Sequence, residues 1–84
     1  MTNLNVRPET LLPYSSGWLV PDANEIRQLI KLINLSGSEL GKLVGVSSRT
    51  VRKWVAGEVS IPFAAWAIMV EYYTGQKIWG ISEG

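Results

Sequence analysis

The sequence predicts an all-α fold: a compact bundle of four to five helices with an irregular or extended N-terminal arm and a short C-terminal tail. Three features support this prediction. Apolar residues recur with the period of a helix, glycines stand where the periodic segments end, and two segments begin with the spacing of a capping box. The chain has 84 residues, which suffices for one small domain but not for two independent ones.

The predicted arm comprises residues 1–21. Prolines interrupt it, and the stretch 11–20 has no helical period, which indicates an irregular or extended backbone. The arm and the tail, residues 76–84, nevertheless carry many apolar side chains. These are Leu11, Leu12, Tyr14, Trp18, Leu19, Ile78, Trp79 and Ile81. They could form a dimer surface or cover the core of the same chain, and the sequence leaves both interpretations open.

The predicted domain between arm and tail, residues 22–75, contains four helices. They are expected at about residues 23–33, 37–44, 48–56 and 62–73. The spacings from Asp22 to Glu25 and from Ser36 to Glu39 are those of capping boxes, which place the starts of the first two helices. The fourth helix begins with a proline, which a first turn tolerates, and it is apolar on nearly every side. We therefore expect it to be the central buried helix.

The second and third helices have the spacing of a helix-turn-helix unit. Counted from Gly37, the fifth residue is Gly41, at a point where two helices approach too closely for a large side chain. The ninth is Gly45, in a turn that requires a positive φ. Apolar residues that press the third helix onto the domain occupy the tenth, fifteenth and eighteenth places; they are Val46, Val51 and Trp54.

The positive charge of the chain is concentrated on this unit, although the net charge is only +1. Between Lys42 and Lys53 there are four cations and no acid, and the seven carboxylates fall outside that window. Such segregation can focus a positive field on one face. By charge alone, an ordinary solvated helix surface explains the pattern equally well.

The third helix has an outward face suited to duplex DNA. If Val51, Trp54 and Val55 point into the domain, the opposite face is polar, basic and free of acids. An arginine can bind guanine O6 and N7 with two hydrogen bonds, whereas hydroxyls and helix N-termini suit phosphates. The predicted base contacts are Ser48, Arg49 and Arg52. The predicted phosphate or mixed contacts are Ser47, Thr50, Lys53 and Lys42.

The run from Gly45 to Trp54, followed by Gly57 and Pro62, resembles the DNA-binding region of the lambda-repressor-like family, also called the Xre or Cro type. The resemblance covers about residues 22–75. It implies a bundle of four or five helices whose third helix enters the major groove, in a homodimer on a palindromic operator. This sequence departs from the family in Val55, where such proteins often carry an acidic residue, and in its long N-terminal segment.

The composition argues against several other classes of function. The chain has no Cys and no His, so metal sites and the common nucleophilic and general-base chemistries lack their usual side chains. We expect no catalytic residue, no metal and no cofactor. The longest apolar run, residues 61–70, is about half of what a membrane span needs, and a secretory signal is absent. We therefore expect a cytoplasmic protein with no membrane partner.

The resulting functional hypothesis is a sequence-specific double-stranded DNA-binding transcriptional regulator, in particular a repressor, that acts as a homodimer. The alternative is a protein–protein interaction module on a helix-turn-helix scaffold, which the low net charge favours. Salt-dependent binding to duplex DNA distinguishes the two, because a pure protein-binding module should show none.

Overall fold

The computed structural model describes residues 6–76 and residue 78, and in these residues it contains helices and no strand. The elements are the 3-10 helices η1 (Pro8–Leu11) and η2 (Tyr14–Ser16) and the α-helices α1 (Ala23–Ile33), α2 (Gly37–Val44), α3 (Ser48–Ala56) and α4 (Phe63–Thr74). The predicted all-α bundle is confirmed. One detail differs: Pro62 is not in the first turn of α4 but is its N-cap, with an extended backbone.

The starts of α1 and α2 are closed capping boxes, as the spacing predicted. The Asp22 side chain accepts a hydrogen bond from the Glu25 backbone N, and the Glu25 carboxylate accepts one from the Asp22 backbone N, both at 2.8 Å. Ser36 and Glu39 form the same reciprocal pair at 2.9 and 3.0 Å. Each capping box provides acceptors for two backbone N–H groups that would otherwise lack a partner at the helix start. The positions at which α1 and α2 begin are therefore determined by side chains close in the sequence.

The turn between α2 and α3 is built on the glycine pair of the helix-turn-helix unit. Gly45 has a φ of 84°, and the backbone N–H groups of Gly45 and Val46 both donate to the Gly41 carbonyl oxygen, at 2.7 and 2.8 Å. A Cβ atom on Gly41 would overlap the carbonyl oxygen of Val46. Gly41 is therefore needed for close approach, as predicted, but the approaching group is the turn backbone rather than a second helix.

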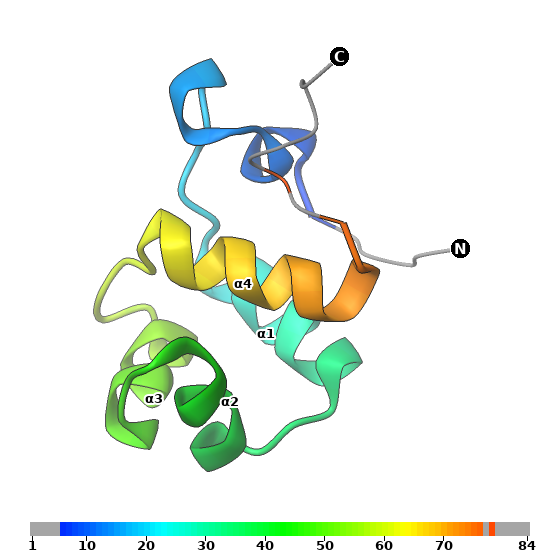
Figure 1. Ribbon diagram of the computed structural model, residues 1–84. Coiled ribbons are helices and arrows are strands. Elements are labelled where there is room, and N and C mark those ends of the chain that lie inside the picture. Colours follow the sequence, from blue (N-terminus) through cyan, green and yellow to red (C-terminus); the bar gives the residue numbers. More distant parts are fainter. Residues whose placement is uncertain (1–5, 77, 79–84) are drawn as a thin grey trace.

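Helix α4 forms the centre of the core. Trp66 and Met69 are completely buried, and α4 packs against α1 and α2, while α3 packs mainly against α2 and α1. In Figure 1, α4 runs between the N-terminal arm on one side and the α2–α3 pair on the other. This arrangement leaves the outer side of α3 away from the core.

The described part of the N-terminal arm, residues 6–21, is docked on α4 rather than extended into solvent. The carbonyl oxygen of the fully buried Thr10 accepts hydrogen bonds from the indole nitrogens of Trp18 and Trp66, at 2.9 and 2.8 Å. Leu11 packs against the core as well. The described arm is irregular, as expected, and includes two short 3-10 helices; by folding back it brings its apolar side chains to α4.

Of the two roles that the sequence left open for the apolar residues of arm and tail, the structure shows one, covering the core of the same chain, for some of them. Core contact is the role of Leu11, Trp18 and the buried Ile78. Leu12, Tyr14 and Leu19 remain exposed. Trp79 and Ile81 lie outside the described residues.

An ion pair also holds the arm to α1. The backbone N and the Nε of Arg7 donate to Glu25 Oε2 at 2.8 and 2.9 Å, and Nη2 donates to Oε1 at 2.9 Å. Burial of the Glu25 carboxylate disfavours its charge, but the hydrogen bonds from Arg7 and from the Asp22 backbone outweigh burial and lower its pKa to about 2. Glu25 thus begins α1 and anchors the arm with the same carboxylate.

Candidate nucleic-acid interface

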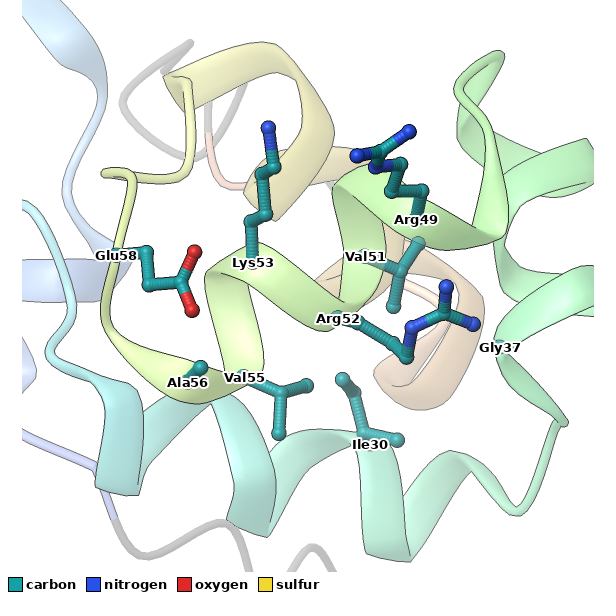
Figure 2. Close-up of a pocket in the computed structure, with 9 residues that line it drawn as sticks. All are labelled: Ile30, Gly37, Arg49, Val51, Arg52, Lys53, Val55, Ala56 and Glu58. Carbon is teal, nitrogen blue, oxygen red and sulfur yellow. The ribbon is translucent and has the colours of Figure 1, made fainter.

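Helix α3 separates a buried apolar side from an exposed cationic side. Val51 and Trp54 are 3% and 2% exposed and belong to the core. Arg49, Arg52 and Lys53 are exposed, and Figure 2 shows all three projecting from α3 away from its packed side. Among the described residues, none of these three cations is held in an ion pair. Their charges are therefore free to meet an anionic ligand.

The three predicted base-contacting residues lie on the first two turns of α3. Ser48 is the first residue of the helix and is half-buried, whereas Arg49 and Arg52 are exposed. A Cβ atom on Gly37 would lie 4.0 Å from the Ser48 Cβ, so the first turns of α2 and α3 are neighbours. Backbone N–H groups at two helix starts are thus presented in one region, next to the arginines.

The predicted phosphate-contacting residues are not all in one place. Ser47 is the exposed N-cap of α3: its Oγ accepts from the Thr50 backbone N and lies 3.2 Å from Thr50 Oγ1. Lys53 is on α3 beside the arginines, whereas Lys42 is exposed in the last turn of α2. The structure therefore groups Lys53 with the arginines and places Lys42 on a different element.

A hollow of about 650 Å³ lies along α3. Arg49, Arg52 and Lys53 line it together with apolar residues from α1 and α3, among them Ile30 and Val55 (Figure 2). A groove with an apolar floor and a cationic rim could accommodate the sugar-phosphate edge or the base edges of a nucleic acid.

One feature of this hollow differs from the sequence prediction and another adds to it. Val55 packs against the core, as expected, but it is only half-buried and also lines the hollow beside Ile30 of α1. Glu58 also lines it, so the surroundings of the α3 face are not free of acids. The chain turns back at Gly57 after α3 and brings this carboxylate to the rim.

Arg27 is a residue of this region that the sequence pattern did not indicate. It is exposed on α1, and its Nη1 donates to the carbonyl oxygen of Val55 at 2.8 Å, in the last turn of α3. A cation is favourable there because the carboxyl end of a helix carries partial negative charge. The two residues are 28 positions apart, so no local signal could have paired them.

Two curated relatives from Escherichia coli, both named transcriptional repressor protein KorC, resemble the chain over nearly its whole length. One is 37% identical over 83 residues, which cover 94% of this chain and 96% of the relative. The other is 37% identical over 82 residues, with coverages of 94% and 95%. The chain belongs to the KorC family. The KorC similarity extends beyond residues 22–75, so it includes most of the arm and tail as well as the helix-turn-helix unit. No family model matches the chain, and no solved structure matches it.

Other kinds of site find little support in the described part of this KorC relative. Within residues 6–76 and 78, no cluster of His, Cys, Asp and Glu side chains is placed to hold a metal ion. In the same residues, no helix has the length and apolar content needed to cross a bilayer. The exposed face of α3 therefore stands out as the candidate functional site of the described chain.

Proposed function

We propose that the chain is a sequence-specific double-stranded DNA-binding transcriptional repressor of the lambda-repressor-like type. In this proposal α3 reads the major groove, and a homodimer occupies a palindromic operator. One observation carries the proposal: α3 buries Val51 and Trp54 and presents on its other side Arg49, Arg52 and Lys53, which form no ion pair within residues 6–76 and 78. The KorC relatives, which are named transcriptional repressors, support a regulatory role.

The side chains have different roles in this proposal. Arg49 and Arg52 read guanine through paired hydrogen bonds to O6 and N7, and Ser48 contacts a neighbouring base edge. The residues that contact phosphates and set the register of α3 are Ser47, Thr50, Lys53 and Lys42. The remaining parts of the proposal are that the protein is not an enzyme, that it uses no cofactor or metal, and that it acts in the cytoplasm.

The proposed organisation of the chain follows from this division of roles. Residues 22–75 are the DNA-binding domain, residues 1–21 are an arm that packs on it and contributes to dimerisation, and residues 76–84 are a tail. The hydrogen bonds from Trp18 and Trp66 to Thr10 support an arm that is structurally part of the domain.

Selection of binding sites from random duplex DNA is the first test of the proposal. We expect an enriched palindrome whose half-site centres are about 34 Å apart along the helix axis, because two α3 helices must enter successive major grooves on one side of the duplex. Recovery of no preferred sequence would contradict sequence-specific reading.

Alanine variants of the two arginines test which helix reads the bases. Arg49→Ala and Arg52→Ala should each weaken binding to the selected site by about 1–3 kcal/mol and relax the preference at one base position per half-site. Lys42→Ala is the matched control, because loss of a phosphate contact should weaken selected and scrambled duplexes alike. The measurement is a titration of each variant against both duplexes.

A protein–protein interaction module remains the competing function, since the same scaffold can serve either role. It predicts that the parent and both arginine variants bind selected and scrambled duplexes equally weakly at every salt concentration. That result would remove α3 as a DNA reader and would favour the alternative.

A further inference from the structure

We propose that Arg27 of α1 is a further DNA-contacting residue, which binds one phosphate beside α3 while it holds the carboxyl end of that helix. The inference rests on the proposed function, because it requires α3 to lie in the major groove. It goes beyond that function in assigning a contact to α1 and in giving one side chain two bonds, one within the chain and one to the duplex.

Arg27 supplies the partner of a carbonyl group that α3 leaves free. The last four carbonyl oxygens of an α-helix accept no hydrogen bond within the helix. In α3, backbone N–H groups of the following turn donate to the oxygens of Lys53 and Trp54, at 2.9 and 3.1 Å. The Val55 oxygen accepts instead from Arg27 Nη1, at 2.8 Å. A guanidinium is favourable at this point because the end of the helix carries partial negative charge.

Helix α1 lies directly against the end of α3. A Cβ atom on Gly57, the C-cap of α3, would lie 3.4 Å from the Ala23 Cβ. One turn of α1 after Arg27, Ile30 lines the α3 hollow together with Val55 (Figure 2). Arg27 is therefore held at the Val55 end of the hollow.

Most donors of this guanidinium, and its charge, remain available. An arginine has five N–H donors, and one of them meets the Val55 carbonyl. Arg27 is exposed, and within residues 6–76 and 78 no carboxylate forms an ion pair with it. Its neighbours on the surface of α1, three and four positions away, include a second cation and no acid; they are Ala23, Asn24, Ile30 and Lys31. An anion that reaches this point meets an unneutralised cation.

The dimensions of the duplex assign Arg27 to a phosphate rather than to a base. An α-helix with its side chains is about 10–12 Å across, and the major groove of B-DNA is about 12 Å wide. When α3 fills the groove, a group beside it on another helix meets the sugar-phosphate strand that borders the groove. The bond to the Val55 carbonyl fixes the guanidinium in advance, so less side-chain freedom is lost on binding.

The salt dependence of binding distinguishes this contact from a purely structural role. Arg27→Gln keeps an amide donor but removes the charge. It should lower the magnitude of the slope of log affinity against log salt by about 0.9 per chain, on the selected and on a scrambled duplex alike. Arg27→Lys keeps the charge and should retain most of the parent slope. A purely structural Arg27 predicts the same slope for the parent and both variants, which would overturn the phosphate contact.

Lys31→Gln is the matched control. It removes the same charge from the same helix one turn later, at an exposed residue that has no hydrogen bond to α3. Because both positions are exposed, both variants should keep the circular dichroism spectrum of the parent. Lys31→Gln should change the slope less than half as much as Arg27→Gln. Equal losses would mean that Arg27 contributes only to the general field, and would overturn the assigned contact.

Neutral phosphates in the duplex provide an independent test. Replacement of single phosphates by methylphosphonates removes one negative charge at a time. At one position in each half-site the replacement should weaken binding of the parent by about tenfold. The same replacement should affect Arg27→Gln much less, because that variant has already lost the contact. If every replacement weakened both proteins equally, Arg27 would contact no phosphate.

The outcomes separate this inference from the proposed function. A parent that binds duplexes with salt-dependent affinity but no sequence preference contradicts reading by α3, whereas the Arg27 contact can still pass both tests. A parent with sequence preference whose slope is unchanged in Arg27→Gln contradicts the inference alone. A parent that binds no duplex contradicts both.

Discussion

At Gly41 the missing side chain allows the carbonyl group of Val46 to lie directly against α2. The Gly41 carbonyl oxygen also accepts hydrogen bonds from the backbone N–H groups of Gly45 and Val46. Gly41 therefore supports the turn both by leaving space and by accepting these two hydrogen bonds. A methyl group on Gly41 would displace the turn backbone at Val46. Because α3 starts at Ser48, two residues after Val46, this displacement would shift the helix that carries the candidate interface.

We expect Gly41→Ala to lower the free energy of unfolding by about 1–3 kcal/mol, since the added Cβ overlaps a backbone atom that cannot rotate away. Gly37→Ala is the control in the same helix. Its Cβ would meet nothing closer than 4.0 Å, so it should be neutral or stabilising by about 0.4–1 kcal/mol. Urea denaturation of both variants measures the difference. Equal stability of the two would mean that the turn adjusts freely.

At the scale of elements, the arm is fixed by polar contacts to two helices as well as by apolar packing. Thr10 connects it to α4 through Trp66, and Arg7 connects it to α1 through Glu25. The Glu25 carboxylate is largely buried and also caps α1, so its loss would release two elements together. The arm and the helical domain should therefore unfold cooperatively.

Glu25→Gln should lower the free energy of unfolding at neutral pH by about 1.5–3 kcal/mol, because it removes a buried charge that accepts several hydrogen bonds. The lowered pKa also predicts a pH dependence. With a pKa of about 2 in the folded chain against 4.5 ordinarily, the carboxylate stabilises the fold above pH 4.5, and this contribution disappears as the pH falls from about 5 to about 2.

Melting temperatures recorded from pH 7 to pH 2 test this linkage. The difference between parent and Glu25→Gln should be greatest near neutral pH and should shrink on acidification. Parallel curves over the whole range would show that the carboxylate has the same pKa in the folded and unfolded chains.

At the scale of the whole molecule, a net charge of +1 conceals an uneven distribution. The cations of α3 and Arg27 of α1 lie on or near one hollow, whereas a groove on α4 is lined by the uncharged residues Phe63, Ala64, Ala67 and Ile68. Duplex binding should depend strongly on salt concentration, because the phosphates interact with the local positive potential of the α3 cations rather than with the net charge of the chain.

If Lys42 and Lys53 each neutralise one phosphate per chain, a dimer should release counterions from about four phosphates. The slope of log affinity against log salt should then be close to about −3.6 from these contacts, and Lys42→Ala should reduce its magnitude by about two per dimer. A slope near zero for the parent would contradict phosphate contacts altogether.

The sequence by itself determined the parts of this protein that depend on near neighbours. The capping boxes at Asp22 and Ser36, the turn at Gly45 and the burial of Trp54 were all predicted correctly. Each depends on hydrogen bonds or packing between residues a few positions apart, whose spacing is visible in the chain. The same periodicity placed Arg49 and Arg52 on the exposed side of α3.

Only the tertiary structure decided how distant segments meet. The Thr10–Trp66 hydrogen bond joins residues 56 positions apart, Arg27–Val55 joins residues 28 apart, and Arg7–Glu25 joins residues 18 apart. The tertiary structure also treats the apolar residues of the arm differently: Leu11 is partly buried against the core, whereas Tyr14 stays exposed beside α4. Such pairings have no local signal, because which partners meet depends on the packing angles of the helices and on the space that other side chains have already filled.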